Sequence, residues 1–134
     1  MSIKFGIYSK LSGAAAVSTI VSTRIYPQVV PQKAALPAIT YRRAGSPREY
    51  THDGPTGRVL SRWEITCWAA TDTAAESLAA VVRPALDNQV GTWGTAAVQE
   101  CFLDDQQDVV DVDSEAELLR AFGVQLTFAI VYEE

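Results

Sequence analysis

The 134-residue sequence has few of the side chains that most enzymes use. It holds a single histidine, His52, and two cysteines, Cys67 and Cys101. It contains no Walker A loop, no GxGxxG fingerprint, no GxSxG elbow, no HExxH and no CxxC. His52 precedes Asp53, but the surrounding segment offers only threonines as nucleophiles, so a solvated loop histidine is favoured over a general base. These absences predict a protein that is not an enzyme and needs no cofactor.

Cations are also scarce, because 11 Lys and Arg face 16 Asp and Glu, for a net charge of −5. Such a chain lacks the clustered cations that neutralise phosphates, so a sequence-independent grip on nucleic acid is not expected. No apolar run is long enough to span a bilayer, and the N-terminus lacks a secretory layout. We therefore expect Cys67 and Cys101 to be buried apolar residues, with no disulfide and no zinc site.

The segment 58–86, RVLSRWEITCWAATDTAAESLAAVVRPAL, predicts a strand followed at once by a helix. Apolar residues alternate through its first half, which places Trp63 and Trp68 on opposite faces of the strand. In the second half they recur at the spacing of one helix stripe. Thr73 with Glu76 three residues later is a capping-box pattern, and Asp72 suits the positive end of the helix dipole.

The remaining elements can be placed around this unit. An Ala-rich helix is expected over residues 3–21, then strands over 24–27, 38–42, 95–103 and 118–132. This order predicts a single α+β domain over residues 1–134. We expect an antiparallel or mixed sheet of about four main strands, with two helices packed on one face.

Two charged segments separate these elements. Residues 44–57 are rich in turn-forming residues and predict a long flexible loop. Residues 104–117 predict an acidic loop, whose spacing does not match a calcium-binding EF-hand, so an interaction role is favoured over a metal site. Trp68 is expected to meet a partner, because its strand carries tryptophan on both faces. The candidate interaction residues are Arg42, Arg43, Arg48, Arg58, Trp68, Asp104, Asp105, Asp108, Asp111 and Asp113.

The expected N-terminal helix and three later pieces, in order, run over nearly the whole chain: TRIYPQVVPQKAALPAITYRRAG, SRWEITCWAATDTAAESLAAVVRPAL and LLRAFGVQLTFAIVYEE. In this order and spacing the sequence resembles the phage tail completion proteins, which join heads to tails in long-tailed phages and prophages. The resemblance implies a structural α+β protomer that forms a ring, commonly a hexamer, at the junction between the capsid connector and the tail. It also implies a place in the virion neck after assembly in the host cytoplasm.

The partners implied by the resemblance are other copies of the chain, the tail tube protein and the head connector or head-closure protein. DNA would pass through the lumen without specific binding, because fixed anions repel phosphate. A ring needs two different patches that fit each other. We expect the basic and acidic segments to meet across subunits, or one of them to contact the neighbouring neck or tube protein. The alternatives are a head-closure or minor tail protein, or a ring- or dimer-forming bacterial protein with a small-molecule site. A pocket with convergent polar groups would favour the last of these.

Overall fold

The computed structural model describes residues 3–28, 30, 35–45, 48–51, 54–113 and 118–133. Within these residues there are three helices, α1 (Ile3–Ser12), α2 (Ala15–Val21) and α3 (Asp72–Leu86). The strands are β1 (Ile25–Pro27), β2 (Ala38–Gly45), β3 (Arg48–Thr51), β4 (Gly54–Ala69), β5 (Gly91–Trp93), β6 (Ala96–Asp113) and β7 (Leu118–Glu133). They form one seven-stranded sheet in the order β1-β2-β4-β7-β6-β5, and β3 pairs with β4 off this path.

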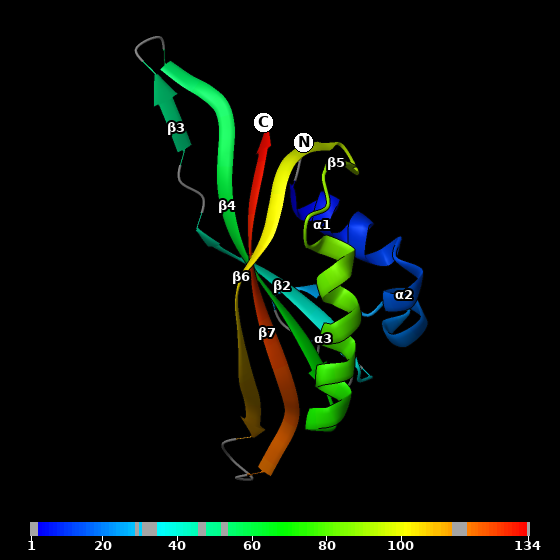
Figure 1. Cartoon of the computed structure of the whole chain (residues 1–134). Helices are drawn as coiled ribbons and strands as arrows, with labels where there is room; N and C mark the ends of the chain where they lie inside the picture. The colour runs from blue at the N-terminus through cyan, green and yellow to red at the C-terminus, as the bar shows by residue number, and fades with distance from the viewer. Residues whose placement is uncertain are drawn as a thin grey trace.

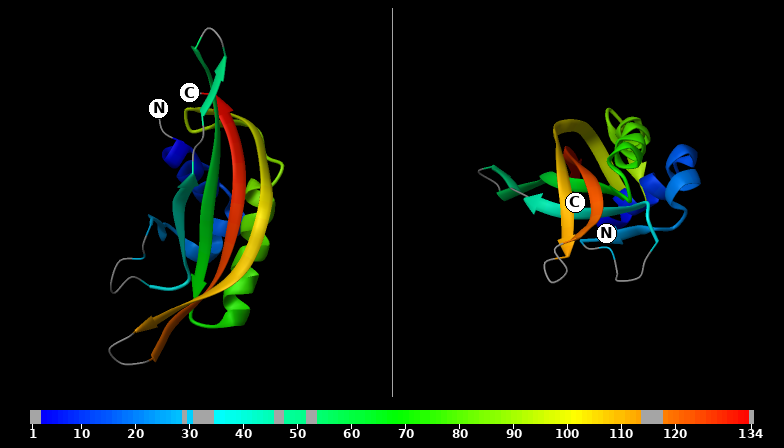
Figure 2. Two further views of the ribbon diagram at one scale, coloured as in Figure 1. Left: turned by 90° about the vertical axis from the view of Figure 1, so that its left-hand side faces the viewer. Right: turned by 90° about the horizontal axis from the view of Figure 1, so that it is seen from below.

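The helices all lie on one face of a long, strongly twisted sheet (Figures 1 and 2). The hairpin of β3 and β4 stands at one end of the sheet, and the hairpin of β6 and β7 stands at the other. The predicted α+β class and the packing of helices on one face are therefore confirmed. The long strands β2, β4, β6 and β7 agree with the prediction of about four main strands. The structure adds the short strands β1, β3 and β5, which carry little periodic signal, and it has three helices where two were predicted.

The central strand β4 has the alternation that the sequence predicts. Its odd-numbered residues from Val59 to Ala69 are buried on the helix side, where Trp63 is fully covered. Trp63 lies opposite Phe128 in the antiparallel ladder between β4 and β7. Burying such large side chains on one face supplies the main stabilisation of the sheet, at about 25 cal/mol per Å² of apolar surface.

Helix α3 packs its apolar stripe on this face, with Leu78, Val82 and Leu86 buried. Its N-cap is Thr71, whose Oγ1 accepts a hydrogen bond from the N–H of Ala74 at 3.1 Å. The capping box expected from Thr73 is therefore wrong, because the helix begins two residues earlier. Asp72 does lie in the first turn, as predicted.

The predicted single helix over residues 3–21 is two helices. Ala14 has extended backbone angles, with φ −83° and ψ 112°, and separates α1 from α2. Gly13 precedes the break and weakens the helix there, because glycine loses more conformational freedom on ordering than any other residue. The apolar stripe survives the break, since Ile7, Leu11 and Val17 are all fully buried.

Strands also occupy much of the two predicted loops. In the segment 44–57, β3 pairs with β4, which begins at Gly54. In the segment 104–117, β6 continues to Asp113 along β7. The physical reason is tertiary, because pairing with a strong strand satisfies the backbone of a polar segment that shows no alternation of its own. Residues 46–47, 52–53 and 114–117 lie outside the described residues, and His52, Asp53 and Glu115 with them.

Candidate interaction surface

The sheet face opposite the helices is bare of helices in the described part of the chain (Figure 2). Polar residues cross this outer face in rows, because neighbouring strands bring their outward residues into register. In one row the Arg42 guanidinium pairs with the Glu64 carboxylate. Gln125 Nε2 donates to the other oxygen of Glu64 at 2.9 Å. Arg42 is thus held within its own chain by β4 and β7.

In a second row, an arginine of β4 pairs with an aspartate of β6 in the same chain. Arg62 Nε lies 3.5 Å from Asp104 Oδ2, across the intervening strand β7. Ala129 of β7 is opposite Arg62 in the register, and its small side chain leaves room for this contact. The Arg62 and Asp104 side chains are 50% and 46% exposed, so water and salt screen the pair. Both side chains therefore remain accessible to a partner.

Trp68 also lies on the outer face, and it is half-buried. Its Nε1–H donates to Thr40 Oγ1 on β2 at 3.1 Å. Its ring lies over Gly123 of β7, because a Cβ built there would come within 2.9 Å of the ring and of Val109. Contacts within the chain fix Trp68, and its predicted contact with a partner stays a prediction.

Arg43 points to the helix side of the sheet. Its guanidinium carbon lies 5.1 Å from the centroid of the Trp63 ring, a cation–π geometry. Tyr41 packs against the same ring, with centroids 6.3 Å apart. Arg42, Arg43 and Lys4 also line a pocket of about 210 Å³ beside Tyr41. Three cations thus gather at the β2 side of the sheet.

The aspartates of β6 are exposed where their side chains are described, at Asp104, Asp105 and Asp108. Asp105 Oδ1 accepts a hydrogen bond from the N–H of Gln106 at 2.9 Å. Among the described residues, no group of three or more His, Cys, Asp or Glu side chains is placed to hold a metal ion. The side chains of four predicted site residues lie outside the described part, namely those of Arg48, Arg58, Asp111 and Asp113.

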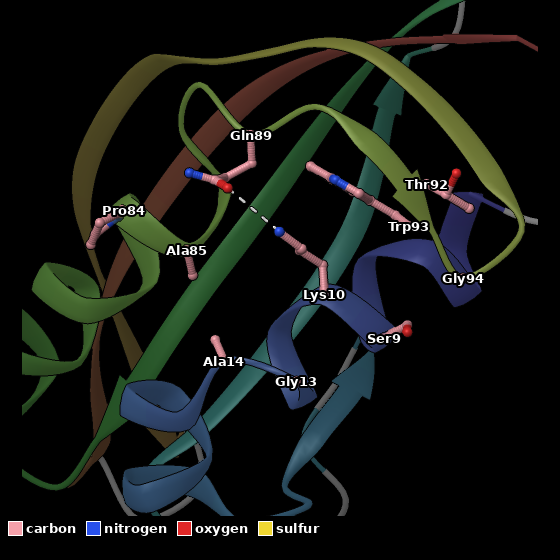
Figure 3. A pocket seen from close by; sticks show the side chains of 10 residues that line it. All are labelled: Ser9, Lys10, Gly13, Ala14, Pro84, Ala85, Gln89, Thr92, Trp93 and Gly94. Carbon is pink, nitrogen blue, oxygen red and sulfur yellow. Dashed lines mark hydrogen bonds between the residues drawn. The ribbon is translucent and has the colours of Figure 1, made fainter.

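A pocket of about 380 Å³ lies between α1, the start of α2, the end of α3 and β5 (Figure 3). Lys10 Nζ approaches Gln89 Oε1 there at 3.5 Å. Trp93 forms part of the wall, and its buried Nε1 has no hydrogen-bond partner among the described residues. Because its lining residues are distant in sequence, no local motif marks this pocket. Its lining includes no carboxylate, histidine or thiol, so Lys10 has no second titratable group beside it in the lining.

The two thiols do not supply a nucleophile either. Cys67 and Cys101 are both free and buried, as the sequence predicted. Burial raises the pKa of the Cys67 thiol to about 12. Burial, assisted by the charge of Asp87, raises the pKa of Cys101 to about 12 as well. Thiols with such pKa values stay protonated and unreactive near neutral pH.

No helix of the described chain is long and apolar enough to cross a membrane. The charged residues described above lie on the outer sheet face and along the sheet edges. The residues near Arg42 and Arg43 are on the β2 side, while the aspartates follow β6 on the opposite side.

Comparison with known proteins identifies a family and a shared fold. The model of the family described as "Tail completion protein gp17" matches residues 6–133. A chain from the virion of a native gene transfer agent (GTA) particle superposes with a TM-score of 0.74 at 16% sequence identity. The match covers 96% of this chain and 92% of that chain, and at this identity it shows a shared fold. No curated protein matches the sequence.

Proposed function

Because the chain belongs to the family of the tail completion protein gp17, it is a structural protein of a phage-type tail, and we propose that it forms a ring that completes the tail and joins it to the head. Its partners in this role are further copies of itself, the tail tube protein and the head connector or head-closure protein. The proposal includes a position in the virion neck, reached after assembly in the host cytoplasm.

One observation carries the ring proposal beyond family membership. The basic residues of β2 and β3 and the aspartates of β6 lie on opposite sides of one sheet. A closed ring is built from head-to-tail contacts, in which each copy presents one patch to a different patch on the next. Two patches of opposite charge on opposite sides of a protomer suit this arrangement, and they orient the encounter between copies.

The acidic balance of the chain is also consistent with a DNA channel. A net charge of −5 disfavours tight binding to phosphates, so DNA can move past the protein without adhering to it. The proposed role is structural and includes no enzymatic activity, in keeping with the family description and with a pocket in which Lys10 has no second titratable group beside it.

The mass of the protein in solution tests this proposal. Native mass spectrometry and light scattering would follow the purified chain over a range of concentrations, in about 0.05 M and 0.5 M salt. Tail tubes or head connectors would be added in parallel. We expect a closed ring at high concentration or on added tail tubes, weakened by salt because exposed charges are screened within about 10 Å at 0.1 M. A monomer under every condition, indifferent to both partners, would refute the proposal.

A further inference from the structure

We propose that neighbouring copies join edge to edge, with β6 of one copy adding as a strand beside β2 and β3 of the next. We define the acidic edge as residues 104–113 of β6. The basic edge is residues 42–45 of β2 together with β3 (Arg48–Thr51). The proposal rests on the proposed ring, and it specifies which backbone groups hold the ring together.

The acidic edge is free of strand partners in the described part of the chain. One side of β6 pairs with β7 along nearly its whole length. On its other side, β5 pairs only with residues 96–98. Asn88 N–H then donates to Cys101 O at 2.8 Å, and Leu103 N–H donates to Asp87 Oδ1 at 3.0 Å. From residue 104 onward no described strand continues this side.

The unpaired backbone groups point outward at alternate positions. An antiparallel strand that is paired on one side leaves the N–H and C=O of every second residue facing away from its partner. Gln106 agrees with this, because its N–H donates to the neighbouring Asp105 side chain. By the same alternation, the N–H of Asp108 faces outward. Such an edge is a template for a further strand.

The basic edge is open in the same way. The short strand β1 pairs with β2 only at residues 39–41, and the N–H of Gln28 closes that contact on Tyr41 O. Residues 42–45 therefore have β4 on one side and no described strand on the other. The strand β3 likewise pairs with β4 on one side only. The two stretches together roughly match the acidic edge in length.

Charge selects the partner of the acidic edge. It carries five aspartates and no cation. Two acidic edges placed side by side would repel each other, because like charges on facing strands are unfavourable. The basic edge carries three arginines, Arg42, Arg43 and Arg48, against one glutamate. A second copy's basic edge is therefore the occupant that these charges favour, and a symmetric pair of β6 edges is disfavoured.

The strand directions agree with this contact. The strands β2, β3 and β7 each run antiparallel to β4, and β6 runs antiparallel to β7. Thus β6 runs opposite to β2 and β3. A copy related by rotation about an axis to which the strands are tilted presents its basic edge roughly antiparallel to β6. The hairpin of β3 and β4 and the hairpin of β6 and β7 stand at opposite ends of the sheet (Figures 1 and 2). The two edges therefore meet only if neighbouring copies are staggered along the strands, as in a closed barrel with tilted strands.

A pair of variants at one position separates backbone pairing from charge. Asp108→Ala keeps the N–H and removes the charge, whereas Asp108→Pro also removes the outward N–H. Proline is tolerated on an edge strand when its missing N–H faces outward, so the protomer is expected to fold. We expect Asp108→Pro to weaken assembly at least tenfold more than Asp108→Ala, measured by mass photometry across a dilution series. Circular dichroism would check folding of both variants.

A charge swap supplies a second test that does not depend on proline. Asp108→Arg and Arg48→Asp are each expected to weaken assembly about tenfold. An equal mixture of the two variants should recover most of the loss, because every contact between unlike copies then pairs opposite charges. The double variant should recover most of the loss, because each interface then carries the swapped pair. Glu76→Arg is the matched control, since it makes the same charge change at an exposed site on α3.

Hydrogen exchange of the assembled protein gives the decisive readout. We expect the outward amides within residues 104–113 to exchange at least tenfold more slowly in the ring than in the monomer. If a ring forms and these amides do not change, edge pairing is refuted while the proposed ring stands. Equal assembly by Asp108→Pro and Asp108→Ala would also refute edge pairing. If no ring forms under any condition, the mass measurement has already refuted the proposed function.

Discussion

At the scale of single residues, Gly123 is the position where the sheet leaves the least room. A Cβ there would lie 2.9 Å from both the Trp68 ring and Val109 Cγ2. We expect Gly123→Ala to lower the free energy of unfolding by about 1–3 kcal/mol, because an added methyl forces packed side chains to move. Urea denaturation would measure this change.

Gly45 provides the matched control for this substitution. A Cβ at Gly45 meets nothing within 4 Å. Gly45→Ala should therefore stay within about 0.5 kcal/mol of the unaltered protein. Equal losses in the two variants would show that Trp68 is not packed on Gly123 as described.

The buried thiols predict how stability depends on pH. The pKa values of Cys67 and Cys101 are raised to about 12 in the folded protein, whereas an unfolded thiol ionises near pH 8.5. Between these values the folded state binds more protons than the unfolded state, so stability falls as pH rises. The slope is about 1.4 kcal/mol per pH unit for each thiol, and the effect is absent below pH 8.

Thermal or urea unfolding between pH 8 and pH 10 would measure this slope. A double variant with Cys67→Ala and Cys101→Ala serves as the control, read by its slope and not by its absolute stability. We expect its stability to be nearly flat over this range. A slope equal to that of the unaltered protein would assign the pH dependence to other groups.

Sequence reasoning reached the burial of single residues but not their partners. Alternation along β4 was enough to place Trp63 inside and Trp68 on the opposite face, and both placements are confirmed. The hydrogen bond from Trp68 to Thr40 joins residues 28 positions apart, so no local sequence pattern predicts it. The same holds for Lys10 and Gln89, which are 79 positions apart.

At the scale of elements, the start of α3 gives a direct comparison of two threonines. Thr71 accepts the hydrogen bond from Ala74 N–H, whereas Thr73 is exposed within the first turn. We expect Thr71→Ala to cost about 1 kcal/mol of stability. Thr73→Ala should be neutral or slightly stabilising, because alanine is the better helix former. Urea denaturation of the two variants would check this, and the opposite order would restore the cap that the sequence predicted.

The elements that sequence reasoning missed are those defined by their neighbours. Half of residues 104–113, DDQQDVVDVD, are aspartates, which are depleted in strands. They are extended because β7 pairs with them, for example at Asp108 with Val124 and at Asp111 with Ala121. By contrast, β7 and α3 carry strong periodic patterns and were predicted close to their observed bounds.

At the scale of the whole molecule, the pairing pattern predicts where the protomer is most stable. The strands β4 and β7 each have strands on both sides and bury one face under the helices. We expect their amides to exchange most slowly with deuterium, near the rate of global unfolding. The three-residue strands β1 and β5 lie at the sheet edges and should exchange much faster in the monomer. Uniform protection across all four strands would contradict this expectation.

The α+β class was predictable because strands and helices differ in period and because the helical stripes need a sheet to cover. Resemblance supplied the family, which the match over residues 6–133 confirms. The order of strands was not predictable, since it places β7 between β4 and β6. Which strands become neighbours depends on contacts between residues distant in sequence. The ring itself remains a prediction.

The long ladder between β4 and β7 also determines how the protomer responds to mechanical force. The two strands run antiparallel in unbroken register from Arg58 opposite Glu133 to Ala69 opposite Phe122. A pull along the strands, applied at opposite ends of the sheet, loads all the hydrogen bonds of this ladder together in shear. None can break before its neighbours share the load, whereas a sideways pull would open them one at a time. The fold is therefore strongest along the direction of its strands.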